Sequence, residues 1–204
     1  PARVGAMPRD GGNADIRWFD VEPCYVFHPM NAYDDGDTIV LDVVRHPKMF
    51  DTELRGPAEG PPTLDRWTVD LADGKVRESR LDDRGQEFPR IDERRLGKSH
   101  RYGYAVGVAD SGPESALLKH DLVGGATAVR QFGNGKMLGE FIFQPATADA
   151  AEDAGVLMGY VYDAATDRSE LAILDAETLD TVASVHLPHR VPAGFHGNWV
   201  PDGQ

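Results

Sequence analysis

The sequence VLMGYVYDAATDRSELAILD, residues 156–175, predicts a β-hairpin and with it the class of fold. In residues 156–163 and 169–175, apolar and polar side chains alternate or β-branched and aromatic residues cluster, as is typical of β-strands. The residues between them, Ala164-Ala165-Thr166-Asp167, are small or polar and suit a tight turn. This stretch therefore predicts two antiparallel strands joined by a short connection.

The same pattern recurs in both directions along the chain. Further strand signals lie in residues 16–22, 38–44, 66–71, 102–108, 126–132, 139–143 and 181–187. The turns Ala72-Asp73-Gly74-Lys75 and Gly133-Asn134-Gly135-Lys136 contain Gly and Asn, which accept positive φ, and predict further hairpins. Residues 51–63 are rich in Gly and Pro and predict one long loop, and residues 149–153 are also read as a loop. Because no amphipathic helical window of ten residues or more is found, the predicted fold class is all-β.

Composition restricts the kind of protein. The 204 residues, 41% hydrophobic and 27% charged, fit one globular domain, or one and a fraction. The net charge is −13 and no basic run is longer than Arg94-Arg95, which argues against nucleic acid as a partner. The single cysteine, Cys24, excludes an internal disulfide and is expected to pack in a strand, and no stretch approaches the roughly 20 apolar residues of a membrane span. We expect a soluble, cytoplasmic protein.

Two of the seven histidines stand in unusual contexts. His28 follows an apolar segment that we expect to be a strand, and it precedes Pro29 and a polar turn. His196 is flanked by glycines in Gly194-Phe195-His196-Gly197, where the absence of Cβ atoms lets main chain approach a metal or ligand closely. The other histidines are expected to be surface or structural residues: His46, His100, His120, His186 and His189.

Two glutamates share a regular spacing with these histidines. Glu87 and Glu140 are each expected to open an aromatic or aliphatic strand, where a carboxylate must be solvated or paired. The intervals from His28 to Glu87, Glu140 and His196 in turn are 59, 53 and 56 residues. Four-stranded propeller blades occupy about 40 to 50 residues or more, and each inner strand faces one central axis. The spacing predicts that the four side chains converge there, with exposed strand-end glutamates as the alternative.

Other motifs of catalysis or binding are absent from the sequence. We find no Gly-x-Gly-x-x-Gly, phosphate loop or Gly-x-Ser-x-Gly. Val123-Gly124-Gly125-Ala126 is read as a hairpin turn. Asp34-Asp35 lacks the alternating oxygen spacing of a calcium loop and is also read as a turn.

Several longer motifs occur in order along the chain and resemble those of one family. They are Phe27-His28-Pro29-Met30-Asn31-Ala32-Tyr33, Glu87-Phe88-Pro89-Arg90-Ile91, Arg101-Tyr102-Gly103-Tyr104, Gly139-Glu140 with Phe143, Leu174-Asp175-Ala176, and Leu187-Pro188 leading into residues 190–197. The sequence resembles the carotenoid cleavage oxygenases, which include stilbene-cleaving dioxygenases and the retinoid isomerase of the eye. This resemblance implies a seven-bladed β-propeller with a non-haem Fe(II) on its axis, bound by four histidines and buttressed by three glutamates.

The resemblance also implies residue roles. His28 and His196 correspond to two iron ligands, Glu87 and Glu140 to two of the buttressing carboxylates, and Phe27 either lines the substrate tunnel or belongs to the core. Neutral imidazoles suit Fe(II), and four of them leave positions for O₂. A carboxylate that accepts the other ring N–H fixes each imidazole. The implied reaction adds O₂ across one conjugated C=C bond of an apolar polyene or stilbene and yields two carbonyl products.

The chain departs from the family pattern in two residues and in extent. Phe141 stands where Pro is usual, and Asp34 where Glu is usual. The other two histidines and the third glutamate have no counterpart in the chain. At about 56 residues per blade, 204 residues make about 3.6 blades. We therefore expect residues 1–204 to be the C-terminal part of a single β-propeller domain, a fragment that is inactive alone, and peripheral membrane contact of the full-length protein stays open.

Two alternatives are kept beside the dioxygenase. One is a non-catalytic propeller fragment that binds a partner, and the other is an iron-dependent polyene isomerase. Metal content separates the first from the dioxygenase, and product analysis separates the second. The architecture we expect is three or four antiparallel four-stranded sheets arranged like a fan, with little helix and with His28 and His196 close together.

Overall fold

The structure, a computed structural model, describes residues 1–54, 59–108 and 115–201. In these ranges it contains fourteen β-strands and two short 3₁₀ helices, η1 (Asn13–Asp15) and η2 (Glu93–Arg95). The strands are β1 (Ala2–Ala6), β2 (Arg17–Val21), β3 (Pro29–Asp35), β4 (Thr38–Arg45), β5 (Thr63–Asp70), β6 (Val76–Asp82), β7 (Gln86–Arg90), β8 (Tyr102–Gly107), β9 (Ala116–Asp121), β10 (Ala126–Gln131), β11 (Lys136–Pro145), β12 (Gly155–Asp163), β13 (Arg168–Asp175) and β14 (Thr181–His186). Among the described residues, no helix has the length and apolar character needed to cross a membrane.

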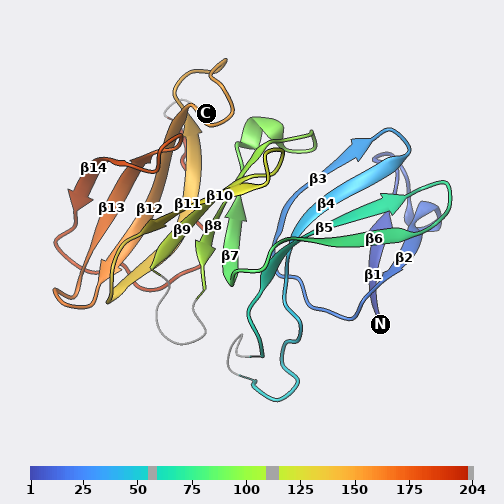
Figure 1. Cartoon of the computed structure of the whole chain (residues 1–204), viewed down its shortest axis with the longest axis horizontal. Helices are drawn as coiled ribbons and strands as arrows, with labels where there is room; N and C mark the ends of the chain where they lie inside the picture. Colours follow the sequence, from blue (N-terminus) through green and yellow to red (C-terminus); the bar gives the residue numbers. More distant parts are fainter. Residues whose placement is uncertain (55–58, 109–114, 202–204) are drawn as a thin grey trace.

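The strands form four antiparallel sheets that are arranged like a fan (Figure 1). Three sheets have four strands each, in the orders β3-β4-β5-β6, β7-β8-β9-β10 and β11-β12-β13-β14, and β1 pairs with β2 in a smaller one. Each four-stranded sheet is a meander of consecutive strands, and β7 lies against both β3 and β11, the first strands of the neighbouring sheets. The predicted all-β fold and its fan of sheets are confirmed.

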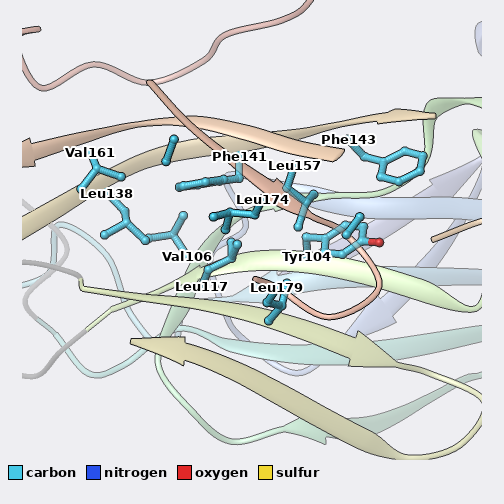
Figure 2. Packing of buried hydrophobic residues seen from close by; sticks show 12 residues of the cluster. Tyr104, Val106, Leu117, Leu138, Phe141, Phe143, Leu157, Val161, Leu174 and Leu179 are labelled. Atoms are coloured by element: carbon cyan, nitrogen blue, oxygen red, sulfur yellow. The ribbon is translucent and has the colours of Figure 1, made fainter. Parts of the chain in front are cut away.

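Apolar side chains fill the spaces between neighbouring sheets. The largest cluster lies between the sheets of β8 and β12 and includes Tyr104, Leu117, Phe141, Leu157 and Leu174 (Figure 2). Smaller clusters join the other sheets, one around Met30, Leu64 and Ile91 and one around Val21, Val43 and Trp67. Each sheet therefore buries its apolar face against the next, which fixes the positions of the inner strands β3, β7 and β11.

Several local predictions were wrong. Residues 29–35, read as a proline followed by a polar turn, form β3, so His28 precedes a strand instead of ending one. Cys24 packs against the cluster around Val43 but lies outside any strand. The Gly133–Lys136 turn links β10 to β11 in a different sheet and closes no hairpin. The predicted loop at 51–63 gives way to β5 at Thr63, and residues 55–58 lie outside the described ranges.

The three inner strands are each irregular. The ladder between β3 and β4 shifts between Pro29 and Asn31, that of β7 and β8 between Glu87 and Arg90, and that of β11 and β12 between Leu138 and Phe141. A bulge inserts an extra residue and re-aims the side chains around it. In a regular strand, successive side chains face opposite sides of the sheet. The bulges interrupt this alternation, so a polar side chain can lie close in sequence to residues of the core.

Candidate metal centre

His28 and His196 meet at the inner strands although 168 residues separate them in sequence. His28 lies directly before β3, and its carbonyl accepts a hydrogen bond from the Val44 amide. His196 lies in the segment that follows β14. The two Nε2 atoms are 3.2 Å apart and the ring centroids 4.8 Å apart. The structure thus places these side chains together, as the sequence analysis expected.

Glu87 lies behind His28. Its Oε2 is 2.6 Å from His28 Nδ1 and also accepts the Phe88 amide, while its Oε1 is 2.8 Å from His46 Nε2. The next residue, Phe88, has φ 53, a left-handed conformation that is uncommon outside glycine. Together with Pro89, which donates no amide hydrogen, it forms the β7 bulge, and this local backbone turns the Glu87 carboxylate toward the histidines.

Glu140 lies behind His196. Its Oε1 is 3.3 Å from His196 Nδ1, and its Oε2 accepts the Gly197 amide at 3.0 Å. The guanidinium of Arg90 is 3.4 Å from the same Oε2, and the Glu140 side chain is only 4% exposed. In a regular strand, Glu140 and Leu138 would face the same side of the sheet. Because of the bulge, Leu138 and Phe141 face the core instead, and Glu140 does not. Glu140 lies in the middle of β11, not at its opening as predicted.

The donor chemistry of this cluster fits a bound cation. Both Nδ1 atoms face carboxylates, so each ring carries its proton there and presents the lone pair of Nε2 to the other histidine. Two such lone pairs 3.2 Å apart repel unless a positive charge lies beside them. Two nitrogens bound to one metal at about 2.1 Å, about 90 to 109° apart, are themselves separated by about 3.0 to 3.4 Å. Within the described residues, no group of three or more His, Cys, Asp or Glu side chains is placed to hold a metal, so the pair stands alone.

Two hollows flank the pair of histidines. One of about 230 Å³ is lined by apolar residues such as Met30, Ile91 and Leu96 and by polar ones, which are His28, Arg90, Glu93, Glu140 and His196. The other, of about 380 Å³, is also lined by His196, together with Phe88, Met137, Leu138 and Tyr160 among others. The ring of Phe88 is 5.7 Å from that of His28 and 6.0 Å from that of His196. The two histidines are therefore bordered by both polar and apolar side chains.

Phe27 is partly exposed in this chain. Its side chain is 41% exposed and packs in an aromatic group with Tyr25 and Phe50, with ring centroids 4.7 and 6.3 Å away. Its ring also meets that of His46 edge-on at 5.2 Å. This aromatic group lies next to the candidate centre, because the Phe27 ring is 6.2 Å from that of His28.

Two residues of the site, His46 and Arg90, were not expected from the sequence. His46, treated as unremarkable, is buried and bonds Glu87. Arg90 contacts Glu140, and it also donates to Glu93 at 2.7 Å and to Asn198 at 3.4 Å. A signal for His46 was present, since it lies two residues after the apolar strand signal 38–44. The remaining histidines whose contacts are known lie elsewhere: His100 bonds Asn31, His120 bonds Gln86, and His186 is 84% exposed.

Consecutive antiparallel meanders fanned around shared inner strands are the architecture of a β-propeller segment. Comparison with solved structures agrees. The cobalt-substituted apocarotenoid oxygenase (ACO) of Synechocystis matches with a TM-score of 0.89 at 33% identity, over 98% of this chain and 44% of the other. That fold is a seven-bladed β-propeller.

Sequence comparison defines the family. Residues 1–201 match the family model described as retinal pigment epithelial membrane protein. A carotenoid cleavage oxygenase of Mycobacterium tuberculosis is 49% identical over 98% of this chain and 42% of its own length. An isoeugenol monooxygenase of Pseudomonas putida is 33% identical over 96% of this chain and 45% of its own length. The chain belongs to the retinal pigment epithelial membrane protein family, which includes carotenoid cleavage oxygenases, and it spans less than half the length of these relatives.

Proposed function

We propose that this chain is the C-terminal part of one β-propeller domain of a non-haem Fe(II) dioxygenase that cleaves a conjugated C=C bond. The substrate class is an apolar carotenoid, apocarotenoid or stilbene, the co-substrate is O₂, and the products are two carbonyl compounds. The observation that carries the proposal is the convergence of the His28 and His196 Nε2 atoms, each ring backed by a carboxylate.

The relatives support the substrate class and the kind of reaction. They are named as oxygenases of carotenoids, apocarotenoids and isoeugenol, all of them unsaturated and largely apolar compounds. One relative was solved with cobalt substituted, which implies a metal site in that protein. The apolar residues that line part of each hollow beside His196 suit such substrates.

In this proposal His28 and His196 bind the iron through Nε2. When bound, ferrous iron supplies the means to activate O₂ for addition to the double bond. Glu87 and Glu140 accept the Nδ1 protons, which holds each ring in one tautomer and one orientation. Phe88 lies against both rings and keeps water from that side of the pair. Two histidines give half of the family's ligand set, so the other two are expected outside this chain.

Glu87 is suited to this role at neutral pH. Burial opposes its ionisation, but hydrogen bonds from His46, the Phe88 amide and His28 outweigh burial and hold the pKa of Glu87 below its ordinary value. The carboxylate therefore remains an acceptor, and His28 keeps its proton on Nδ1 and its lone pair on Nε2.

The test uses the chain extended upstream to the length of its relatives. This protein, loaded with Fe(II), is incubated aerobically with a carotenoid, an apocarotenoid and a stilbene, and the products are identified by mass spectrometry. We expect two carbonyl products from at least one substrate, loss of both on His196→Ala, and unchanged activity on His186→Ala, which alters an exposed histidine away from the site.

The possible outcomes separate the alternatives. A product of unchanged mass and altered double-bond geometry would replace the dioxygenase with an isomerase. An iron-loaded protein that converts none of the three substrates, or a His196→Ala variant that stays active, contradicts the proposal. Two carbonyl products lost with His196 support it and exclude a merely structural propeller fragment.

A further inference from the structure

His46 is a buried histidine that contacts Glu87, the carboxylate beside His28 in the candidate centre. Its side chain is 1% exposed, and Nε2 lies 2.8 Å from Glu87 Oε1. Its backbone pairs with Tyr25 in both directions, at 2.8 and 3.0 Å, so His46 is fixed against the segment that leads to His28. Both ends of the contact with Glu87 are thus held in place.

The protonation of His46 follows from its partners. Since Glu87 is an acceptor, His46 must donate from Nε2, and this tautomer leaves a lone pair on Nδ1. The Nδ1 atom is buried and has no hydrogen-bond partner among the described residues. Nε2–H is therefore the ring group of His46 that has a polar partner among the described residues.

The contact matters because of how Glu87 is held. Its other donors, His28 Nδ1 and the Phe88 amide, both bond Oε2 and leave the carboxylate free to turn about that oxygen. His46 bonds the other oxygen and removes that freedom. Glu140 is clamped differently, by the Gly197 amide and the Arg90 guanidinium on one oxygen with His196 on the other. Each carboxylate therefore has three polar partners, but the third partner of Glu87 is His46, whereas that of Glu140 is the Arg90 guanidinium.

We propose that His46 is a positioning residue for the metal centre: its Nε2–H fixes the Glu87 carboxylate, which in turn orients the His28 imidazole. This inference rests on the proposed function, because it assigns His28 to the iron. It predicts that the hydrogen-bond donor of His46, and not the bulk of its ring, supports metal affinity.

The test measures Co(II) affinity and the visible absorption of the Co(II) form in the upstream-extended protein. His46→Phe keeps the bulk and removes the donor, and His46→Asn carries an amide one bond too short to reach Glu87. Each substitution should weaken Co(II) binding by about tenfold, which is the smaller of the losses typical when a hydrogen-bond partner of a metal ligand is removed. Each should also shift or broaden the absorption bands. His46→Gln, whose amide nitrogen is as many bonds from Cβ as Nε2 is, should stay within about threefold of the unaltered protein.

Two controls separate positioning from general destabilisation. His100→Phe alters another buried histidine, which bonds Asn31 and none of the four site residues, and should leave Co(II) affinity and absorption unchanged. In a Glu87→Ala background, His46→Phe should cause no further loss, because the two residues act through one contact.

Each outcome bears on one proposal. If the unaltered protein binds Co(II) and His46→Phe and His46→Asn bind it as tightly, or His100→Phe weakens binding equally, the role of His46 is overturned while the metal centre stands. An effect of His46→Phe that persists without Glu87 also overturns it. If the unaltered protein binds no Co(II), the proposed function fails and the inference fails with it.

Discussion

At the scale of single residues, Arg90 contacts the carboxylate behind His196. Its guanidinium is 3.4 Å from Glu140, whose side chain is nearly fully buried, and it reaches Glu93 and Asn198 as well. Removing a partner from a buried carboxylate leaves the charge poorly solvated. Arg90 therefore joins β7, β11 and the segment that carries His196.

We predict that Arg90→Met lowers the free energy of unfolding by about 1 to 3 kcal/mol, because Glu140 loses its only cationic contact among the described residues. Urea unfolding measures this change. Lys75→Met is the control, since Lys75 is exposed and 3.8 Å from Asp73, and it should change stability by less than about 0.5 kcal/mol. Equal effects of the two substitutions would contradict the role given to Arg90.

His120 provides a prediction about pH. Burial lowers its pKa to about 4, although nearby Asp82 opposes the shift. The unfolded chain binds this proton below about pH 6.5 and the folded protein only near pH 4. Stability should therefore fall as pH drops through this window, by up to about 1.4 kcal/mol per pH unit from this group. His120→Gln should flatten the slope of unfolding free energy against pH, and an unchanged slope would show that His120 is not held neutral.

The sequence predicted which four residues meet but not how they are held. His28, Glu87, Glu140 and His196 could be found because a blade-sized interval separates them. The contact of His46 with Glu87 spans 41 residues and depends on the bulge at Phe88, which apolar alternation does not reveal. The contact of Arg90 with Asn198, 108 residues away, likewise depends on how separate sheets pack.

At the scale of strands, the bulge in β11 depends on close packing across the β11–β12 ladder. A Cβ on Gly159 would come within 2.5 Å of the buried Phe141 ring, which follows Glu140 in sequence. A Cβ on Gly139 would make only an ordinary contact, 3.5 Å from the Tyr160 carbonyl oxygen. The two glycines lie on paired strands: Gly139 lies within the bulge of β11, and Gly159 pairs with Phe141 at its end.

We predict that Gly159→Ala lowers the free energy of unfolding by about 1 to 3 kcal/mol, because Phe141 must move in a packed core. Gly139→Ala should change it by less than about 1 kcal/mol. Chemical denaturation of both variants measures the difference. A Gly139→Ala variant as unstable as Gly159→Ala would show that the bulge itself requires glycine.

The strands that could be predicted have apolar alternation or a run of β-branched and aromatic residues. β4, β12 and β13 have such a pattern, whereas β3 has the sequence Pro-Met-Asn-Ala-Tyr-Asp-Asp and was read as a proline and a turn. β6, Val76–Asp82, is mostly charged because it is an outer strand of its sheet. Residues 29–35 and 76–82 therefore form strands because they pair with neighbouring strands, and their local sequence pattern does not predict it.

At the scale of the whole molecule, the chain exposes surface that suits further packing. Every residue of β14 is exposed, and apolar side chains are exposed there and after it, including Val185, Phe195, Trp199 and Val200. An unpaired strand edge beside exposed apolar residues favours association. We predict that the 204-residue chain self-associates in sedimentation velocity and that the upstream-extended protein does so less; a strictly monomeric 204-residue chain would contradict this expectation.

In the proposed function, His28 and His196 hold iron together with ligands outside this chain. The most direct measurement is the Fe(II) content and affinity of the upstream-extended protein, its His196→Ala variant and the 204-residue chain. We predict about one tightly held iron per extended protein, and weak binding by both the variant and the 204-residue chain, because affinity depends on ligand number and a preformed site. Stoichiometric, tightly held iron in the His196→Ala variant would contradict the ligand assignment, and the same result for the 204-residue monomer would contradict its description as half of a site.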